Sequence, residues 1–182
     1  MPQTLVTPRL SLRALRASDA GLMTHYCSDL RLAQMVSIPH PYPPGAAEAF
    51  IASVTGGRVS EEVWAMDATR SGGEELLGVI SYKPDSESIG YWVGWPFWNT
   101  GYASEALLEV VRHLFEDRGS ATLSATVSTD NPASRYVLEK AGFQVVQEAD
   151  GFSIVRAEAV RQWHLALSSA DWHSSQRRTA FG

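Results

Sequence analysis

The chain has 182 residues, 45% of them hydrophobic and 19% charged, with a formal net charge of −5 at pH 7. This length suffices for one domain with a substantial core, and the composition excludes the collagen, coiled-coil and disordered classes. The acidic balance argues against a protein built chiefly to bind nucleic acid, because phosphate neutralisation requires a basic surface.

The N-terminal half predicts a strand, two helices and a run of further strands. Alternation of residue types over 10–15 predicts the first strand, and Pro8 places its start at an edge or a bulge. The proline-rich segment 38–45 interrupts regular structure, and the helix after it ends at Gly56-Gly57. The later strands of this half are expected over 61–69, 75–82 and 87–94, with a loose turn at 71–73 between the first two.

The first helix is expected to begin at Ser18-Asp19, where an acidic side chain suits a helix N-terminus. Leu22, Tyr26 and Leu30 repeat at a spacing of four and therefore share one face. The single cysteine, Cys27, lies among apolar residues of this helix, so we interpret it as a packed side chain. One cysteine also excludes an intrachain disulfide.

The strongest helical pattern runs from Gly101 to Asp117, where apolar residues recur at spacings of three and four. A strand is expected over 121–128. Asn131-Pro132 then opens a shorter helix with a capping residue and a proline at N1, and Gly142 closes it. The last strands are expected over 143–148 and 159–167, and the polar segment from Ser174 is expected to be frayed. This order predicts a mixed α/β sheet rather than a regular βαβ alternation.

The segment from Trp98 to Ser104 is the first candidate site. A helix start presents free backbone N–H groups and the positive end of a dipole, and Gly101 and Ala103 leave room for a phosphate. An ordinary helix N-terminus with a glycine in its loop explains the same residues. The segment is neither a P-loop nor a dinucleotide fingerprint, because the required lysine and glycines are absent.

The segment from Asn131 to Phe143 is the second candidate site. Capping alone explains Asn131, and Ser134 falls near N3, where a hydroxyl can also serve the helix end.

Together these two segments resemble the GNAT superfamily of acetyltransferases, and within it the RimJ/RimL-like group that acetylates ribosomal-protein N-termini. Trp98–Ala106 is similar to that group's W-G-x-G-Y-A-T-E-A, and Asn131–Phe143 to its N-x-x-S-x-x-V-x-E-K-x-G-F. The opening Thr7–Arg13 resembles its T-x-R-L-x-L-R, and Ile89–Val93 resembles its I-G-Y-W strand. These features keep the family's order over residues 7–172.

The resemblance implies the GNAT fold, a central mixed and mostly antiparallel twisted sheet flanked by about four helices. It also implies one N-acetyltransferase domain over 1–173, followed by a flexible tail over 174–182. The implied activity is transfer of an acetyl group from acetyl-CoA to a primary amine, either a protein α-amine or a small molecule. The sequence shows neither the charged N-terminal region of a signal peptide nor a run of about 20 apolar residues. We therefore expect a cytoplasmic protein without a membrane partner.

The resemblance also implies roles for individual residues. The pyrophosphate of CoA would be held by backbone amides of Thr100, Gly101, Tyr102, Ala103 and Ser104. The strand that contains Trp92 and Val93 would pair with the pantetheine arm, and an amide near Val93 would polarise the thioester carbonyl. Asn131 would lie beside the pantetheine, Ser134 would be the general acid for the departing thiolate, and Arg135 would reach a CoA phosphate.

Two positions depart from related sequences. Leu138 stands where many GNAT enzymes carry a tyrosine acid, and Ser88 stands where the RimJ/RimL-like group often carries a glutamate. Glu87 is one residue away and would face the opposite side of the strand, so the base cannot be transferred. Glu87 and His40 are only weak candidates for the general base. An α-amine, with a pKa of about 7.7–8.0, needs less help from a base than a lysine amine does.

Alternatives remain open for the acceptor and for the whole protein. Trp95, Phe97 and Trp98 would form an acceptor site, a homodimer interface or part of the core. His25, His113, His164 and His173 show no metal-ligand spacing, so no metal is expected. The loss of the usual acid at Ser88 permits a catalytically weak acyl-CoA-binding module, and a nucleotide-binding protein is a weaker alternative.

Overall fold

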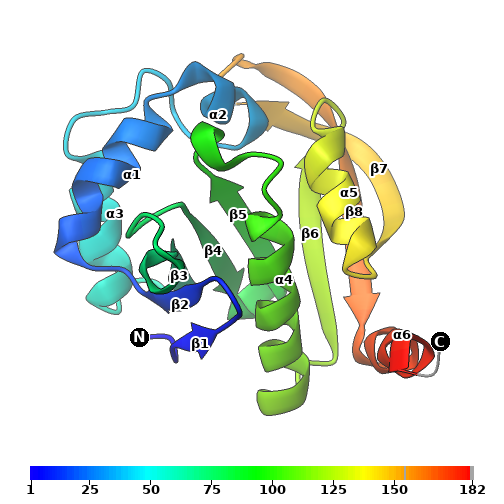
Figure 1. Cartoon of the computed structure of the whole chain (residues 1–182). Coiled ribbons are helices and arrows are strands. Elements are labelled where there is room, and N and C mark those ends of the chain that lie inside the picture. The colour runs from blue at the N-terminus through cyan, green and yellow to red at the C-terminus, as the bar shows by residue number, and fades with distance from the viewer. Residues whose placement is uncertain (154, 181–182) are drawn as a thin grey trace.

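A twisted sheet of eight strands organises the molecule (Figure 1). The structure is a computed structural model that describes residues 1–153 and 155–180. The strand order is β1-β2-β3-β4-β5-β6-β8-β7, and every neighbouring pair is antiparallel except β5 and β6, which are parallel. The strands are β1 (Leu5–Val6), β2 (Ser11–Ala14), β3 (Glu62–Asp67), β4 (Gly78–Lys83), β5 (Ser88–Val93), β6 (Thr122–Ser128), β7 (Gln144–Ser153) and β8 (Glu158–Ser168).

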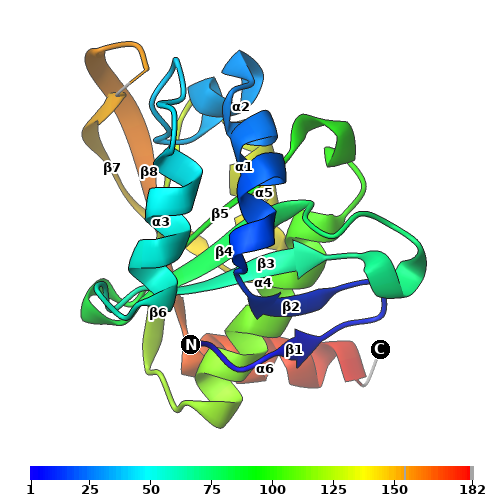
Figure 2. The same cartoon turned by 90° about the vertical axis from the view of Figure 1, so that its left-hand side faces the viewer.

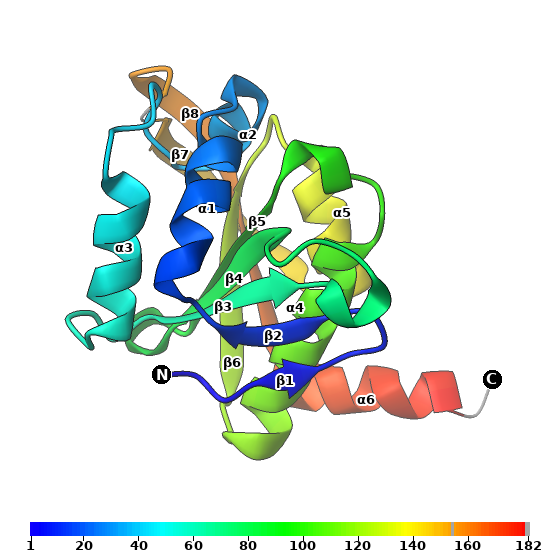
Figure 3. The ribbon, with the colours of Figure 1, turned by 60° about the vertical axis from the view of Figure 1, so that its left-hand side comes forward.

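Helices cover both faces of this sheet, as Figures 2 and 3 show: α1 and α3 lie on one face, and α4 and α5 lie on the other. The helices are α1 (Ala20–Cys27), α2 (Leu30–Met35), α3 (Ala46–Thr55), α4 (Tyr102–Arg112), α5 (Pro132–Lys140) and α6 (Ser169–Ala180). Two hydrophobic clusters, one on each face, hold the layers together. The mixed, mostly antiparallel α/β fold that the sequence predicts is therefore confirmed.

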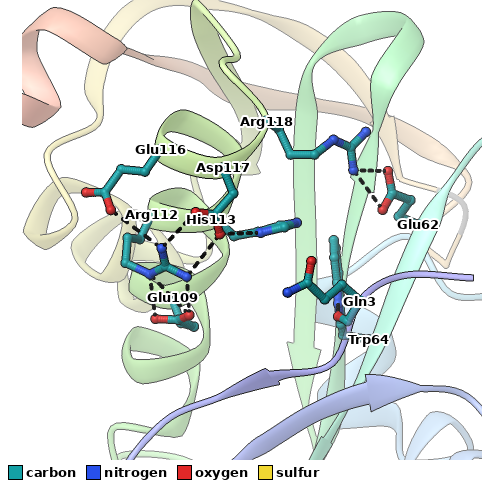
Figure 4. Close-up of polar contacts among 9 residues, drawn as sticks. All are labelled: Gln3, Glu62, Trp64, Glu109, Arg112, His113, Glu116, Asp117 and Arg118. Atoms are coloured by element: carbon teal, nitrogen blue, oxygen red, sulfur yellow. Dashed lines mark hydrogen bonds and ion pairs between the residues drawn. The ribbon is translucent and has the colours of Figure 1, made fainter.

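The helix predicted from Gly101 to Asp117 is confirmed, and its last turn, His113–Asp117, is a π-turn. Its apolar positions Leu107, Val110 and Leu114 are fully buried. In the polar contacts beside this turn (Figure 4), His113 Nδ1 lies 2.9 Å from an Asp117 carboxylate oxygen. Arg118 donates to Glu62 at 2.8 Å and so ties the end of the helix to β3.

The first helix is shorter than predicted. It ends at Cys27, and Asp29 caps the separate helix α2 by accepting a hydrogen bond from the Arg31 backbone N–H at 2.9 Å. Leu30 consequently leaves the face that Tyr26 occupies and is exposed, so the predicted shared face of these residues is wrong. Cys27 is buried as predicted, and burial raises the pKa of its thiol to about 12.

The C-terminal part of the chain holds more regular structure than the sequence predicts. Strand β7 runs from Gln144 to Ser153, well beyond the expected 143–148, whereas β8, Glu158–Ser168, confirms the expected 159–167 to within one residue at each end. The segment from Ser174 belongs to α6 as far as Ala180, and the remainder of the expected tail, 181–182, lies outside the described residues. With α2 and α6, the described helices number six rather than the expected four or so.

Candidate functional site

The sheet divides between β5 and β6. These two strands share a single register pair, Ser88 with Ser124, and then diverge (Figure 1). The Ser124 backbone N–H donates to the Glu87 carbonyl at 2.9 Å, at the end of the strands where they still touch. Beyond that point β5 has a neighbouring strand on its β4 side only.

The backbone of β5 presents alternate residues to the gap. The Gly94 N–H donates to the Leu77 carbonyl at 2.8 Å, so Gly94 faces β4 in the antiparallel ladder, and Trp92 faces β4 by the same alternation. The peptide groups of Tyr91 and Val93 therefore point into the gap. The indole N–H of Trp98 donates to the Val93 carbonyl there at 2.7 Å, which leaves the Val93 N–H directed the same way.

Helix α4 begins beside this gap without a side-chain cap. Gly101, at φ 85°, turns the chain into the helix, and the first intrahelical hydrogen bond runs from the Glu105 N–H to the Gly101 carbonyl at 3.0 Å. The amides of Tyr102, Ala103 and Ser104 precede it and have no acceptor within the helix. Their N–H groups and the positive end of the helix dipole suit an anionic group.

The connection between β1 and β2 holds the start of α4 in place. One Glu105 carboxylate oxygen accepts from the Thr7 hydroxyl at 2.6 Å and from the Arg9 backbone N–H at 2.8 Å, and the other accepts from Arg9 Nε at 2.6 Å. Arg9 also donates to the Thr100 carbonyl at 2.9 Å and lies over the Tyr102 ring. Burial acts to raise the pKa of Glu105, but the hydrogen bonds from Thr7 and Arg9 outweigh it and lower that pKa.

On the other side of the gap, Asn131 caps α5 as predicted. Its side-chain oxygen accepts from the Ser134 N–H at 3.1 Å, and its amide nitrogen donates to the Met35 carbonyl at 3.2 Å. The Asn131 side chain thus joins the start of α5 to the end of α2.

Ser134 faces β5. Its hydroxyl lies 2.9 Å from the Tyr91 hydroxyl, and the Ser134 carbonyl accepts from the same phenol at 3.1 Å. Burial raises the pKa of Tyr91 to about 12, although the hydrogen bond with Ser134 acts to lower it. Leu138, one turn further along α5, is fully buried in the core.

Two cavities meet at these residues. The α4–α5 cavity, of about 620 Å³, lies between the start of α4, strand β5 and helix α5. The hairpin cavity, of about 510 Å³, extends from the opposite face of β4 and β5 to the β7–β8 hairpin. Both cavities are lined by Met35, Val36, Tyr91, Trp92, Asn131 and Ser134.

The structure brings most of the predicted site residues together. The α4–α5 cavity is lined by Trp92, Val93, Gly101, Tyr102, Ala103, Ser104, Asn131 and Ser134. Thr100 and Arg135 are not among its lining residues. The Thr100 hydroxyl donates to the Phe97 carbonyl, and the Arg135 guanidinium pairs with Glu139 at 2.7 Å and stacks on Trp163. That Arg135 reaches a CoA phosphate therefore stays a prediction, with its guanidinium held by Glu139 and Trp163 in this structure.

Neither of the two candidates for a base, Glu87 and His40, lines either cavity, whereas Ser88, at the position of the missing acid, lines the hairpin cavity. Sequence reasoning missed Glu61, the one carboxylate among the residues that line the hairpin cavity. It also missed Lys140, which lines the α4–α5 cavity, and Tyr91, which stood within the recognised I-G-Y-W motif.

The three aromatic residues that follow β5, Trp95, Phe97 and Trp98, lie in different surroundings. Phe97 packs against the core, and Phe97 and Trp98 line the α4–α5 cavity. Trp95 is 42% exposed, and the Arg31 guanidinium stacks on it at 3.9 Å from the ring centroid.

Over residues 1–153 and 155–180, no group of three or more His, Cys, Asp or Glu side chains is arranged to hold a metal ion. No helix in the described part of the chain is long and apolar enough to cross a membrane.

Comparison with known proteins identifies the class of molecule. Residues 9–144 match the family model described as an acetyltransferase (GNAT) domain, so the chain belongs to the GNAT acetyltransferase family. It is similar to the N-acetyltransferase p20 of Bacillus licheniformis, at 25% identity over 78% of this chain and 83% of p20. It is also 38% identical to the N-acetyltransferase YoaA of Bacillus subtilis, over 39% of this chain and 43% of YoaA, which is less than half of that relative.

Among solved structures, the ribosomal L7/L12 α-N-protein acetyltransferase RimL, in complex with coenzyme A, shares the fold at a TM-score of 0.76. The alignment covers 91% of this chain and 98% of RimL, at 19% identity. The protein is thus an N-acetyltransferase, and its family membership implies acetyl transfer that depends on acetyl-CoA.

Proposed function

We propose that the protein transfers the acetyl group of acetyl-CoA to a primary amine by direct attack, with both substrates bound at once. The observation that carries this proposal is the meeting of two cavities, from opposite sides of the divided sheet, at Tyr91, Asn131 and Ser134. Such an arrangement can hold two molecules with their reactive ends in contact, which supplies much of the rate of a two-substrate reaction.

Acetyl-CoA would occupy the α4–α5 cavity. Its pyrophosphate would lie on the amides of Tyr102, Ala103 and Ser104, at the uncapped start of α4. Lys140, which lines the same cavity, supplies a cation for a phosphate in the place predicted for Arg135. The pantetheine arm would run along β5 and pair with the peptide groups of Tyr91 and Val93, which face the gap.

The amine would approach through the hairpin cavity and attack the thioester carbonyl carbon. A C–N bond forms, and the carbonyl oxygen becomes an oxyanion that a backbone N–H near Val93 stabilises, a large contribution in reactions of this kind. The C–S bond then breaks with its electron pair on sulfur. Ser134 passes its hydroxyl proton to the sulfur and recovers, through solvent, the proton that the amine nitrogen releases.

A weakly basic acceptor, such as a protein or peptide α-amine or a small-molecule amine, fits this site best. Ser88 supplies no carboxylate, and neither Glu87 nor His40 lines the cavity. Glu61, the carboxylate that does line it, precedes β3, and strand β4 separates β3 from β5. An α-amine, with a pKa of about 7.7–8.0, is already about a tenth neutral at pH 7, whereas a lysine amine near 10.4 is not. RimL, a ribosomal L7/L12 α-N-protein acetyltransferase that shares this fold, supports the peptide version of this proposal.

The experiment mixes purified protein with acetyl-CoA and a panel of peptides and small amines, and follows the release of free thiol. Ser134→Ala is expected to lower turnover about tenfold or more, since acid–base help contributes about 10²–10⁴. Ser174→Ala is the matched control, because that hydroxyl donates to the Ala170 carbonyl within α6, away from both cavities. Tight acetyl-CoA binding without turnover on any amine would replace the proposal with an acyl-CoA-binding module.

A further inference from the structure

Tyr91 stands at the junction of the two cavities and contacts the hydroxyl to which the proposed mechanism gives the leaving-group proton. The Tyr91 phenol lies 2.9 Å from the Ser134 hydroxyl and 3.1 Å from the Ser134 carbonyl, and Tyr91 lines both cavities. The side chain leaves β5 on the face that α5 covers, which explains how residues 43 positions apart meet.

The phenol has one hydrogen and two acceptors within reach, so two hydrogen-bond arrangements exist. If the phenol donates to the Ser134 carbonyl, the Ser134 hydroxyl hydrogen is free to turn back onto the phenol oxygen. If the phenol donates to the Ser134 hydroxyl oxygen, the hydroxyl hydrogen is directed away from Tyr91. The second arrangement is the one that obliges the Ser134 hydrogen to point away from Tyr91 and leaves it available to the α4–α5 cavity.

The environment of Tyr91 keeps its phenol a donor. Burial raises the pKa of Tyr91 to about 12, so the phenol retains its hydrogen across the neutral range. A partly buried neutral donor beside a hydroxyl oxygen also stabilises negative charge that develops on that oxygen, because the protein surroundings screen this charge less than water does.

We propose that Tyr91 is a positioning residue for acetyl transfer: its phenol donates to the Ser134 hydroxyl oxygen and directs the Ser134 hydrogen to the departing sulfur of CoA. The inference rests on the proposed function and deepens it. As the C–S bond breaks, sulfur takes the electron pair and the Ser134 proton. Tyr91 keeps its own proton and stabilises the Ser134 oxygen until solvent returns the proton that the amine releases.

A purely structural role is the competing explanation, since the hydrogen bond to the Ser134 carbonyl also ties α5 to β5. That role predicts a less stable Tyr91→Phe protein with an unaltered chemical step. The two explanations separate in a double-mutant cycle that combines Tyr91→Phe with Ser134→Ala. Tyr82→Phe is the control, because Tyr82 is a buried tyrosine of the adjacent strand β4 that lines neither cavity.

In steady-state kinetics, Tyr91→Phe is expected to lower kcat about tenfold, while KM for acetyl-CoA stays within about twofold. In the Ser134→Ala background, Tyr91→Phe is expected to lower kcat no further. Tyr82→Phe is expected to keep the wild-type kcat. An unchanged kcat in Tyr91→Phe, or a full second loss in the double variant, overturns the proposal while leaving the proposed function in place.

A second measurement does not depend on turnover. CoA bound to wild-type protein is titrated, and its thiolate is followed by ultraviolet absorbance. A directed Ser134 hydroxyl stabilises the thiolate, so Tyr91→Phe and Ser134→Ala are each expected to raise the pKa of the bound thiol by about 0.5–1 unit. The other titratable side chains lining this cavity are unchanged in every variant: Tyr102, Asp130, Tyr136 and Lys140. An identical thiol pKa in wild type and Tyr91→Phe overturns the proposal, and failure of CoA to bind overturns the proposed function with it.

Discussion

Glu105, in the first turn of α4, accepts a hydrogen bond from Arg9 Nε at 2.6 Å, although 96 positions separate these residues in the chain. The same carboxylate accepts from Thr7, and Arg9 also holds the Thr100 carbonyl. The loop that leads into α4 is therefore fixed by the connection between β1 and β2 rather than by a side-chain cap of its own. Whatever binds the free amides of α4 meets a helix start that is already in position.

Replacement of Glu105 by Gln is expected to raise KM for acetyl-CoA about three- to tenfold and to leave kcat within about twofold. The variant loses a charged acceptor for Arg9, and hydrogen bonds to charged groups contribute about 1.5–3 kcal/mol. Steady-state kinetics measures the effect. Glu109→Gln is the matched control, since Glu109 lies one turn further along α4 and pairs with Arg112. Equal KM values in the two variants would refute a role for Glu105 at the cofactor loop.

The contribution of Glu105 to stability is expected to disappear in acid. Burial acts to raise the pKa of Glu105, but the hydrogen bonds from Thr7 and Arg9 dominate, so the folded-state pKa lies below the unfolded one. The unfolded chain then binds more protons, and this contribution is complete above a pH of about 4.5 and is lost as pH falls through the folded-state pKa. Urea unfolding should show wild type and Glu105→Gln differing near neutrality and converging in acid. A gap that stays constant with pH would contradict the assigned ion pair.

Asn131 is expected to have two functions, capping α5 and holding the end of α2 through Met35, and two different substitutions should distinguish them. Asn131→Ala removes the cap of α5 and should lower the free energy of unfolding by about 1 kcal/mol. Asn131→Asp keeps an oxygen that accepts from the Ser134 N–H but loses the donor to the Met35 carbonyl. It should therefore retain most of the stability while raising KM for both substrates, since Met35 lines both cavities. Chemical denaturation and kinetics together test the separation, and equal stability losses in the two variants would contradict it.

Replacement by alanine is expected to destabilise the protein at Gly78 but to have little effect at Gly90 in the adjacent strand. A Cβ at Gly78 would lie 2.1 Å from the Trp92 carbonyl oxygen, so β4 or β5 must move. A Cβ at Gly90 would meet the Ser81 hydroxyl at an ordinary 3.7 Å. Gly78→Ala should lower the free energy of unfolding by about 1–3 kcal/mol, and Gly90→Ala should change it by less than about 0.5 kcal/mol. Thermal unfolding of both variants measures the difference, and equal melting temperatures would disprove the close approach.

Local patterns predicted the elements that carry the site. The helix from Gly101 shows apolar spacing over several turns, and the helix from Asn131 has a cap, a proline at N1 and a terminal glycine, all of which the structure confirms. Each signal is contained within one segment. The position of Ser134 at N3 follows from the same reasoning, because a cap fixes the numbering of the first turn.

Contacts between distant segments left no such signal. The Tyr91–Ser134 and Arg9–Glu105 pairs depend on how strands and helices pack, and each residue alone is ordinary. The sequence prediction for Arg135 concerned a CoA phosphate and did not include its ion pair with Glu139, four residues further along α5. The length of β7 was missed because most of its residues are exposed, so apolar and polar side chains do not alternate along it.

Because β6 diverges from it, β5 has backbone N–H and C=O groups without a strand partner, as an edge strand does, although β5 lies in the middle of the sheet. Unpaired peptide groups along a margin usually invite other extended chains, and proteins protect them with charge, bulges or covering elements. Here α4 and α5 flank the exposed peptide groups, so a folded partner cannot reach them and a slender, flexible molecule can. At the outer edge of a sheet, unpaired strand backbone of this kind would promote aggregation. Between β5 and β6, the flanking helices instead limit pairing to molecules slender enough to enter the gap.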